Sequence, residues 1–296
     1  MKILVLGCNG QLGRCLQDQL DAQSHEIIFS SRQNINIENF QEAKKKILDL
    51  VPDIVINAAA YTSVDRAETD QKKTNVVNHL AVKNLADVCK LLNSWLIHIS
   101  TDYVFDGSSD IPYKEDDFIN PKGVYGRTKL NGELSIFASK CKYIILRTSW
   151  VFSEYGKNFL TTMLRLGSQQ DEMRVVVDQI GCPTYAQDLA KTINYIAKLI
   201  PSNTLTPTIY HYSGDKPTSW HHFAQTIFKE AQSKGMKVPN EVYAIKTSAY
   251  PSKAPRPASS AMNSSKIKKE LGIDPCDWKQ GINSAIEGFI KRNSPE

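Results

Sequence analysis

Residues 2–13, KILVLGCNGQLG, decide the fold. They begin with a short apolar run that ends at a glycine, which is typical of a strand buried on both faces of a parallel sheet. Gly7, Gly10 and Gly13 form a G-x-x-G-x-x-G pattern, and apolar residues then recur with the period of a helix over 11–22. A strand, a glycine-rich turn and a helix in this order are typical of a phosphate-binding loop, because glycines let backbone N–H groups approach an anion.

The same alternation of strand and helix continues through the first half of the chain. Further strands are predicted at 25–31, 52–60, 95–101 and 142–149. Helices are predicted between them at 37–50, at 73–93 and from Tyr125 onward. This alternation requires crossover connections and predicts an α/β fold with a doubly wound parallel sheet of the Rossmann type.

The second half of the chain has a different rhythm. Its elements are shorter and its prolines cluster at Pro251, Pro255 and Pro257, which indicates a second, smaller α/β lobe. One more strand is predicted at 206–214, so the chain is expected to return to the sheet. The predicted Rossmann domain is 1–148 and 183–212, and the predicted nucleotide-sugar lobe is 149–182 and 213–296.

The composition limits the class of ligand. The chain has 296 residues, of which 41% are hydrophobic and 23% are charged. Lys and Arg number 36 against 31 Asp and Glu, a formal charge of +5. This surplus suits an anionic small molecule, but it is too small and too scattered to indicate nucleic-acid binding.

The cysteines and the apolar runs indicate a location. Six cysteines are present, and no pair has the C-x-x-C spacing of a zinc or redox site, so a reducing compartment is expected. The N-terminal apolar run ends at the glycine turn, and no later run approaches the roughly 20 apolar residues of a membrane span. We expect a cytoplasmic protein that has no membrane partner.

The end of the second predicted strand bears on the choice of cofactor. Dinucleotide-binding folds often place an acid there, about 20 residues after the glycine loop, to hold a ribose hydroxyl. This chain has Ser30, Ser31 and Arg32 instead. An arginine accepts the 2′-phosphate that an acid repels, so we predict NADPH as the cofactor and leave NADH open.

Two further stretches supply a candidate for acid catalysis. Thr101 lies in STDYVFDG (100–107) at the carboxyl end of a predicted strand, where open α/β sheets bind ligands. Tyr125 and Lys129 are four residues apart on a predicted helix and therefore share one face. Lys129 is expected to lower the pKa of Tyr125 from about 10, because a nearby ammonium favours the phenolate. Such a phenol can donate a proton to a carbonyl oxygen that Thr101 also binds.

Two other polar features are expected to be structural. His98 lies in a predicted buried strand, where a hydrogen-bonded core residue is expected. The acidic run KEDD at 114–117 is expected to be a solvated loop near the mouth of the pocket.

Several motifs together resemble a known family. G-x-x-G-x-x-G, NAAAYTSVD, STDYVFDG and Y-x-x-x-K are similar to those of the extended short-chain dehydrogenases. RTSWVF, VDQIGCPTYAQDLA and RPASSAMNSSKI narrow the resemblance to the dTDP-4-dehydrorhamnose reductases, over nearly the whole chain. The resemblance implies that hydride from NAD(P)H reduces the C4 ketone of dTDP-4-dehydro-β-L-rhamnose to dTDP-L-rhamnose, a rhamnose donor for surface polysaccharide.

The resemblance also implies roles for individual residues. Thr101, Tyr125 and Lys129 match the catalytic positions. Together with the glycine loop and the end of the second predicted strand, the resemblance gives these expected cofactor-binding residues: Gly7, Gly10, Gln11, Leu12, Gly13, Arg32, Asn36, Ile37, Ala58, Ala59 and Ala60. The expected substrate-binding residues are Thr101, Trp150, Asn158, Gln179 and Arg256.

Three of these positions need a comment. The Trp150 indole is expected to pack on the sugar, and Arg256 is expected to pair with the diphosphate. Asn36 stands where the family more often has an aspartate, which leaves the contact with adenosine open.

The chain departs from the family at a metal site. Some members form a dimer bridged by Mg²⁺ through carboxylates on the first helix and after a Pro-Thr pair. Here the first-helix position is Cys15, and in the later segment only Asp188 keeps a carboxylate. Mg²⁺ needs hard oxygen ligands, so we predict no metal, and a monomer or a weak homodimer.

Related proteins of the same fold have other activities. Nucleotide-sugar 4,6-dehydratases carry Thr-Asp-Glu where this chain has Thr101, Asp102 and Tyr103, so their second acid/base pair is missing here. Epimerases keep NAD tightly bound, which Arg32 argues against. A reductase with the C4-epimeric product, such as dTDP-6-deoxy-L-talose, stays open. A non-catalytic subunit such as the regulatory subunit of methionine adenosyltransferase also stays open, although the intact catalytic set favours an enzyme.

Overall fold

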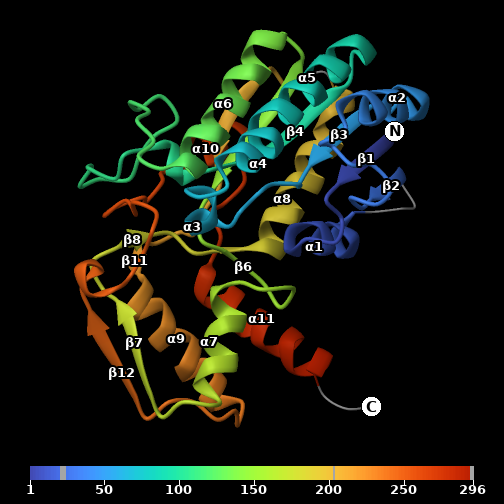
Figure 1. The fold of residues 1–296 in the computed structure, drawn as a ribbon. Coiled ribbons are helices and arrows are strands. Elements are labelled where there is room, and N and C mark those ends of the chain that lie inside the picture. The colour runs from blue at the N-terminus through green and yellow to red at the C-terminus, as the bar shows by residue number, and fades with distance from the viewer. Residues whose placement is uncertain (21–24, 203, 294–296) are drawn as a thin grey trace.

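A six-stranded parallel sheet is the centre of the computed structural model, which describes residues 1–20, 25–202 and 204–293. Its strands are β1 (Lys2–Leu6), β2 (Glu26–Ser30), β3 (Ile54–Asn57), β4 (Trp95–Thr101), β5 (Lys142–Thr148) and β10 (Thr208–His211). They lie in the order β10-β5-β4-β3-β1-β2 (Figure 1), and all neighbours are parallel. The predicted doubly wound α/β fold is confirmed, with its switch point between β1 and β3.

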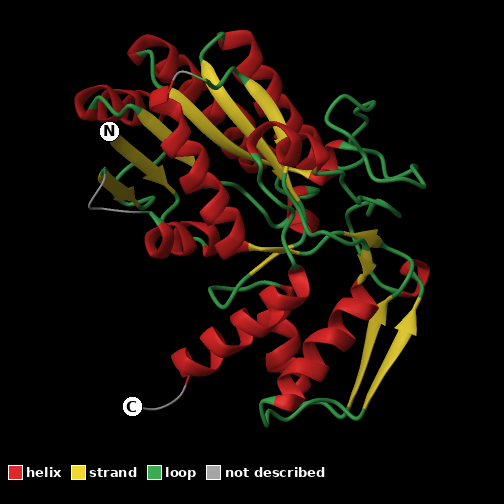
Figure 2. Ribbon diagram, turned by 180° about the vertical axis from the view of Figure 1, so that it is seen from behind, coloured by secondary structure: helices red, strands yellow, loops and turns green. Residues whose placement is uncertain are grey.

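Helices cover both faces of this sheet (Figures 1 and 2). Because side chains alternate along a strand, β1 contributes to a core on each side, with Ile3 and Val5 on one and Leu4 and Leu6 on the other. The first face is covered by α1 (Gln11–Gln19) and α8 (Ala186–Leu199). The second is covered by α2 (Phe40–Leu50), α5 (Ala81–Leu92) and α6 (Val124–Ser139). The first helix was predicted to run to residue 22; it ends at Gln19, and 21–24 lie outside the described residues.

The helix predicted over 73–93 contains an irregular turn. α4 (Gln71–Asn75) passes into a π-helical turn, η1 (Val76–Leu80), before α5 begins. The buried Asn78 of this turn binds the backbone of Tyr61 after β3, accepting from its N–H at 2.9 Å and donating to its carbonyl at 3.0 Å. π-turns often occur at functional sites, and this one ties the loop after β3 to the helix layer.

A smaller unit lies below the sheet in the view of Figure 1. Its two long strands, β7 (Glu172–Val176) and β12 (Glu241–Ile245), pair in parallel. Its helices are α7 (Phe159–Gly167), α9 (Trp220–Ser233) and α11 (Trp278–Asn293). Short pairs link it to the sheet: β6 (Val151–Phe152) with β9 (Thr184–Tyr185), and β8 (Ile180–Gly181) with β11 (Thr218–Ser219). The short helices are α3 (Val64–Ala67), η2 (Asp102–Val104), η3 (Ile200–Ser202), η4 (Thr247–Ala249) and α10 (Ser265–Leu271).

β10 joins the sheet as the run at 206–214 predicted, and α10 packs beside it. Lys266 Nζ donates to Thr208 Oγ1 at 2.7 Å, and the Tyr210 hydroxyl donates to Glu270 at 2.8 Å. α10 therefore contacts the sheet, although it falls in the segment predicted for the second lobe. The division into two domains at the predicted bounds stays a prediction.

A buried ion pair joins α6 to β5. Arg147 Nη2 and Nε donate to the two carboxylate oxygens of Glu133 at 2.7 and 3.0 Å, and neither side chain is exposed. Ser100 of β4 donates to the same carboxylate. A two-pronged contact of this kind fixes orientation as well as charge, so it holds α6 against two central strands.

Arg147→Met should lower the free energy of unfolding by about 3–5 kcal/mol, because it leaves the Glu133 carboxylate buried without its cation. Lys83→Met breaks the exposed pair with Asp87 and is the matched control, with an expected loss below about 1 kcal/mol. Urea unfolding followed by circular dichroism measures both losses. Similar small losses in the two variants would mean that the buried pair does not hold α6.

Candidate active site

The three predicted catalytic residues come from two adjacent elements. Thr101 is the last residue of β4, and Tyr125 and Lys129 lie in the first turns of α6. The Tyr125 hydroxyl lies beside Thr101, whose side chain lowers the Tyr125 pKa against the effect of burial, and the Thr101 hydroxyl donates to Asp102 Oδ1 at 2.9 Å. The structure thus brings Thr101 and Tyr125 together at the carboxyl end of the sheet, where open α/β sheets bind ligands.

Lys129 is bound to the neighbouring strand β4. Its Nζ donates to the Ile99 carbonyl at 2.6 Å and contacts His98 Nε2 at 3.2 Å. His98 is buried and also contacts Asn57 of β3 at 3.1 Å, so the prediction of a hydrogen-bonded core histidine is confirmed. Lys129 therefore anchors α6 on the sheet.

The predicted lowering of the Tyr125 pKa is wrong for the net shift, to which Lys129 makes no resolved contribution. Burial raises the pKa of Tyr125 above its ordinary value; the Thr101 side chain opposes this rise, and the Asp102 carboxylate adds to it. The helical spacing showed that Tyr125 and Lys129 share a face, but it did not show that the ammonium binds β4 or that the phenol is desolvated. Tyr125 is therefore a neutral phenol that keeps its proton near neutral pH.

Burial has the opposite effect on Lys129, because it disfavours the charged form of each group. It lowers the pKa of Lys129 to about 8, while the charge of Glu133, one turn further along α6, raises it by less. Lys129 is thus a cation near neutral pH and loses its charge under mildly alkaline conditions.

Lys129→Met should remove a pH dependence of stability. The pKa of Lys129 falls from 10.5 to about 8 on folding, so its stabilising contribution is complete above the unfolded pKa and is lost as the pH falls through about 8. Between about pH 7 and pH 10.5 the wild-type chain should gain about 3 kcal/mol over the variant. Urea unfolding at both pH values measures the gain, with the exposed Lys45→Met as control. A gain of zero would contradict the lowered pKa.

Two neighbours of Thr101 belong to the site although no role was predicted for them. Asp102 is buried, and burial raises the pKa of its carboxyl to about 6, while the Ser260 and Thr101 side chains lower it by less. The rings of Tyr103 and Tyr125 meet edge to face with centroids 5.6 Å apart. Their one signal in the sequence is their place beside Thr101 in STDYVFDG.

The glycine loop is packed too closely for side chains. A Cβ on Gly13 would lie 2.3 Å from the Gly7 carbonyl oxygen, and one on Gly7 would lie 2.8 Å from Ala59 N. Gly7 also has a φ of +81°, which favours glycine. The N-terminus of α1 therefore approaches the ends of β1 and β3 closely, as a pyrophosphate-binding loop requires.

A cavity of about 390 Å³ opens beside this loop. The predicted cofactor residues that line it are Gly7, Gly10, Arg32, Asn36, Ile37, Ala58, Ala59 and Ala60. Glu38, Tyr61 and Lys73 line it as well. Its size and its position at the switch point of the sheet fit the adenosine half of a dinucleotide.

The other predicted cofactor residues support the loop. The Gln11 amide donates to the Val151 carbonyl at 3.1 Å and accepts from Ser153 at 3.2 Å, which ties the start of α1 to β6. Leu12 is buried in the core between α1 and the sheet.

Trp150 has a strained backbone and packs on a second tryptophan. Its φ of +47° lies in the left-handed region, which costs a non-glycine residue about 1–3 kcal/mol. Its indole stacks on Trp220 with centroids 3.4 Å apart and planes 6° apart. A Cβ on Gly181 would lie 2.4 Å from Trp150 Cε2. Trp220 therefore covers one face of the indole that was predicted to pack on the sugar.

Asn158 and Gln179 are engaged with other protein groups. Asn158 caps α7, since its Oδ1 accepts from Thr161 N at 3.1 Å and its Nδ2 donates to the Ser153 carbonyl at 2.7 Å. Gln179 is buried and donates to Thr247 Oγ1 at 3.1 Å.

Arg256 also has partners within the protein. Its guanidinium donates to Asp65 Oδ2 at 2.7 Å and to the Tyr103 hydroxyl at 3.0 Å. Asp65 accepts from Ala254 N as well, at 3.1 Å. These contacts join the segment before α10 to α3 and place Arg256 beside Tyr103.

The acidic run at 114–117 is only partly solvated. Glu115 Oε1 accepts from His211 N at 2.8 Å, and the Glu115 carbonyl accepts from Arg147 Nη1 at 3.2 Å. The prediction of a solvated loop is wrong for Glu115, because a buried cation and an edge-strand N–H need partners.

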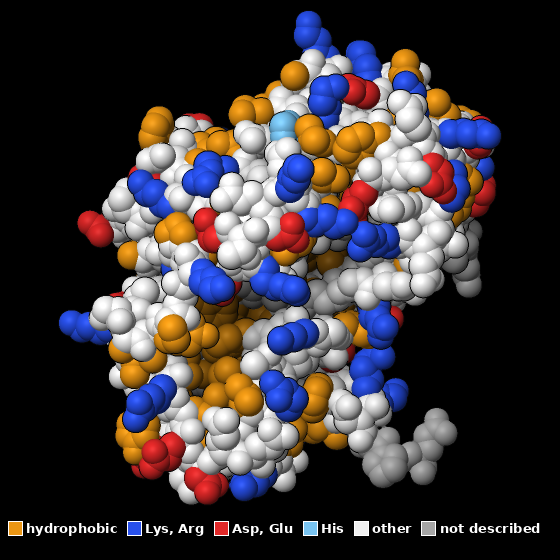
Figure 3. Space-filling model, in the orientation of Figure 1, with side chains coloured by type: hydrophobic (Ala, Val, Ile, Leu, Met, Phe, Trp, Pro, Cys, Tyr) orange, Lys and Arg blue, Asp and Glu red, His pale blue; other side chains and the backbone are white. Residues whose placement is uncertain are grey.

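Figure 3 shows a hollow between the sheet and the smaller unit. Hydrophobic side chains line its interior, and Lys and Arg side chains surround its mouth. An apolar interior with a cationic rim suits a ligand that has both an anionic and an apolar part.

Known proteins match this chain over almost its whole length. The family described as RmlD substrate binding domain matches residues 1–290. A dTDP-4-dehydrorhamnose reductase of Aggregatibacter actinomycetemcomitans is 43% identical over 287 residues, which cover 96% of this chain and 97% of that protein. The chain belongs to the dTDP-4-dehydrorhamnose reductase family.

Two other members of the dTDP-4-dehydrorhamnose reductase family agree with this. The protein of that name from Escherichia coli K12 is 35% identical over 290 residues, which cover 97% of both chains. The crystal structure of dTDP-4-dehydrorhamnose reductase from Bacillus anthracis in complex with NADP has a TM-score of 0.89 and 34% identity, over 97% of this chain and 98% of that chain. The family predicted from the motifs is confirmed.

The positions that carry a metal in some dTDP-4-dehydrorhamnose reductases have other neighbours here. Cys15 is buried in the core, and Asp188 pairs with Lys191 at 3.0 Å. Within 1–20, 25–202 and 204–293, no group of three His, Cys, Asp or Glu side chains is placed to hold a metal ion. That the chain forms no metal-bridged dimer stays a prediction.

Gly181→Ala should separate the stacked tryptophans, because its Cβ would overlap the Trp150 ring. Near-ultraviolet circular dichroism should change as much as it does in Trp220→Phe, which removes the stack directly. Overpacking should also lower the free energy of unfolding by about 1–3 kcal/mol. A wild-type spectrum for Gly181→Ala would show that the indole does not depend on this glycine.

Proposed function

We propose that this chain reduces the C4 ketone of dTDP-4-dehydro-β-L-rhamnose to dTDP-L-rhamnose with NADPH, NADH being a second possible donor. The observation that carries the proposal is the pair of hydroxyls, Thr101 and Tyr125, at the end of β4. They lie in a fold whose glycine loop borders a cavity fit for a dinucleotide. Family membership and the likeness to an NADP complex support the substrate and the cofactor.

Thr101 and Tyr125 act together on the ketone oxygen. When bound, the reduced nicotinamide supplies the hydride that adds to the ketone carbon. Tyr125 donates its proton to the oxygen as negative charge develops there. Thr101 lies beside Tyr125, so both hydroxyls can bind one oxygen and fix its position.

The raised pKa of Tyr125 keeps the phenol protonated near neutral pH, and it also makes the phenol a weaker acid. A half-buried, neutral phenol has its proton in place when the ketone binds. Lys129 lies one helical turn away, and its pKa of about 8 leaves it charged near neutral pH. Its ammonium then stabilises the phenolate that proton transfer leaves behind.

The remaining predicted residues have proposed roles in binding. Gly7, Gly10, Gln11, Leu12 and Gly13 form the pyrophosphate loop, and Arg32, Asn36, Ile37, Ala58, Ala59 and Ala60 surround the rest of the cofactor. Trp150, Gln179 and Arg256 form the nucleotide-sugar side, where Arg256 exchanges Asp65 for the diphosphate. Asn158 acts through its cap on α7.

Domain organisation, location and assembly belong to the same proposal. The Rossmann domain is 1–148 and 183–212, and the nucleotide-sugar lobe is 149–182 and 213–296. All six cysteines are free and buried, which fits a cytoplasmic location. The described helices include none long and apolar enough to cross a membrane. The chain acts as a monomer or a weak homodimer.

Tyr125→Phe should lower the rate of reduction by about 10²–10⁴-fold, because general acid catalysis is worth that much. NADPH affinity should stay the same, since the cofactor cavity is not altered. Consumption of NADPH with dTDP-4-dehydrorhamnose measures the rate, and fluorescence titration measures the affinity. Tyr143→Phe, at the start of β5 and away from the site, is the control.

Near-normal turnover by Tyr125→Phe would mean that the proton comes from another group. Wild-type protein that binds NADPH but leaves the sugar unchanged would favour a non-catalytic role. A product with the talo configuration would mean that the mechanism is the same but that hydride adds to the opposite face of the ketone.

A further inference from the structure

Three charged side chains meet at the adenosine end of the cofactor cavity. Arg32 follows β2, Glu38 precedes α2, and Lys73 belongs to α4. Arg32 Nη2 lies 2.8 Å from Glu38 Oε1, and Lys73 Nζ binds the other oxygen, Glu38 Oε2. All three line the cavity, and no other charged side chain of the described residues does so. The cluster therefore has two cations, one anion and a surplus charge of +1.

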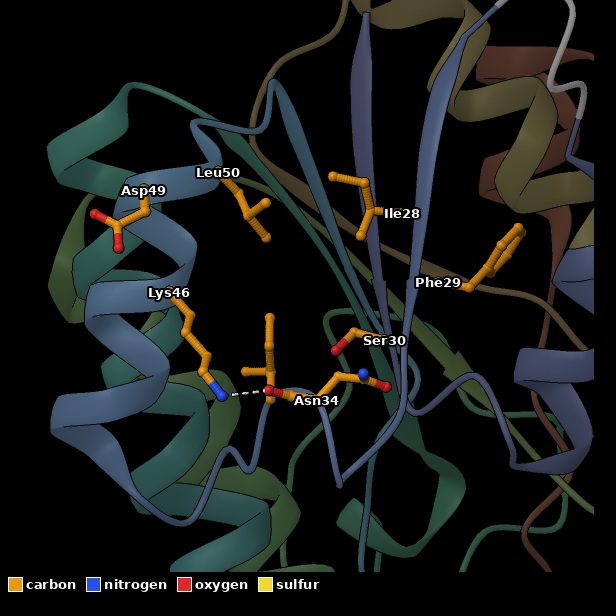
Figure 4. A pocket seen from close by; sticks show the side chains of 8 residues that line it. Ile28, Phe29, Ser30, Asn34, Lys46, Asp49 and Leu50 are labelled. Atoms are coloured by element: carbon orange, nitrogen blue, oxygen red, sulfur yellow. Dashed lines mark hydrogen bonds between the residues drawn. The ribbon is translucent and has the colours of Figure 1, made fainter.

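The backbone around this cluster is ordered by local hydrogen bonds. Ser31 Oγ donates to Asn34 Oδ1 at 2.6 Å, and Lys46 Nζ donates to the Asn34 carbonyl at 2.6 Å. Figure 4 shows the second contact in a neighbouring pocket between β2 and α2. Asn36 Oδ1 accepts from Glu38 N at 3.2 Å. Arg32 and Glu38 thus stand on turns that are fixed without a ligand.

We propose that Lys73 joins Arg32 in binding the 2′-phosphate of NADPH, and that Glu38 competes with this phosphate for both cations. The proposal rests on the proposed function, which makes NADPH the cofactor. Lys73 belongs neither to the glycine motif nor to the position at the strand end that usually binds the ribose. It reaches the cavity from α4, in the segment that the π-turn joins to α5.

The chemistry follows from the exchange of one oxyanion for another. Arg32 and Lys73 present N–H donors to the two carboxylate oxygens of Glu38, and a phosphate accepts the same donors with more negative charge. When NADH is bound, Glu38 remains between the cations and can accept from the ribose hydroxyls. The cluster therefore admits both cofactors, and Glu38 limits the preference for NADPH.

Binding of adenosine fragments tests this without turnover. The probes are 2′,5′-ADP, which carries the 2′-phosphate, and 5′-AMP, which lacks it. Lys73→Met should weaken 2′,5′-ADP about tenfold, the usual effect of losing one charge-assisted hydrogen bond, and should leave 5′-AMP within about twofold. Glu38→Gln should increase the affinity for 2′,5′-ADP. It should lower the affinity for 5′-AMP or leave it the same. Lys72→Met is the matched control, because Lys72 is the preceding lysine of α4 and does not line the cavity.

Calorimetric titration of the full chain gives these constants. Equal affinity of Lys73→Met and Lys72→Met for 2′,5′-ADP would overturn the proposal, and so would an equal loss of both probes in Lys73→Met, which would indicate a structural role. The proposal would also be overturned if the wild-type chain bound neither probe. If the probes behave as expected but the sugar is not reduced, the proposed function fails and the phosphate site stands. If the sugar is reduced with NADPH but Lys73→Met does not change the affinity for 2′,5′-ADP, the proposed function stands and the phosphate site fails.

Discussion

The buried pair of Glu133 and Arg147 is the contact on which the candidate site depends. It fixes α6 against β5, while Lys129 fixes the same helix against β4 through the Ile99 carbonyl. Two charged side chains in a core require partners, so the register of α6 cannot slip without leaving a charge unpaired. This constraint places Tyr125, at the start of α6, beside Thr101 at the end of β4. The geometry of the proposed catalytic pair therefore follows from buried charges in the core.

Burial also sets the proton chemistry. It raises the pKa of Tyr125 and lowers the pKa of Lys129 to about 8, because it disfavours the charged form of each group. Near neutral pH the proposed donor, Tyr125, is then neutral, and Lys129 carries its charge but loses it above about pH 8. Desolvation therefore decides the pKa values of Tyr125 and Lys129. The attraction expected from their i,i+4 spacing has a smaller effect on these pKa values.

Local sequence patterns predicted those features of the structure that depend on residues close together in the chain. The glycine loop, the alternating strands and helices of the first half and the pair Tyr125 and Lys129 all follow from short motifs, and the structure has them in the predicted elements. Contacts between distant segments were not predictable from one sequence. The stack of Trp150 on Trp220, the Arg256 contact with Asp65 and the inward turn of Glu115 each join segments far apart in the chain. The prediction for the pKa of Tyr125 is wrong for the same reason, because desolvation depends on tertiary packing.

The transfer of a labelled hydride tests the central claim most directly. The chain would be incubated with dTDP-4-dehydrorhamnose and NADPH that carries deuterium at the transferring position of the nicotinamide, and the sugar would be examined by NMR. We expect deuterium at C4 of a sugar with the rhamno configuration. A sugar without deuterium at C4, or a ketone that remains while NADPH stays bound, would contradict reduction at this site.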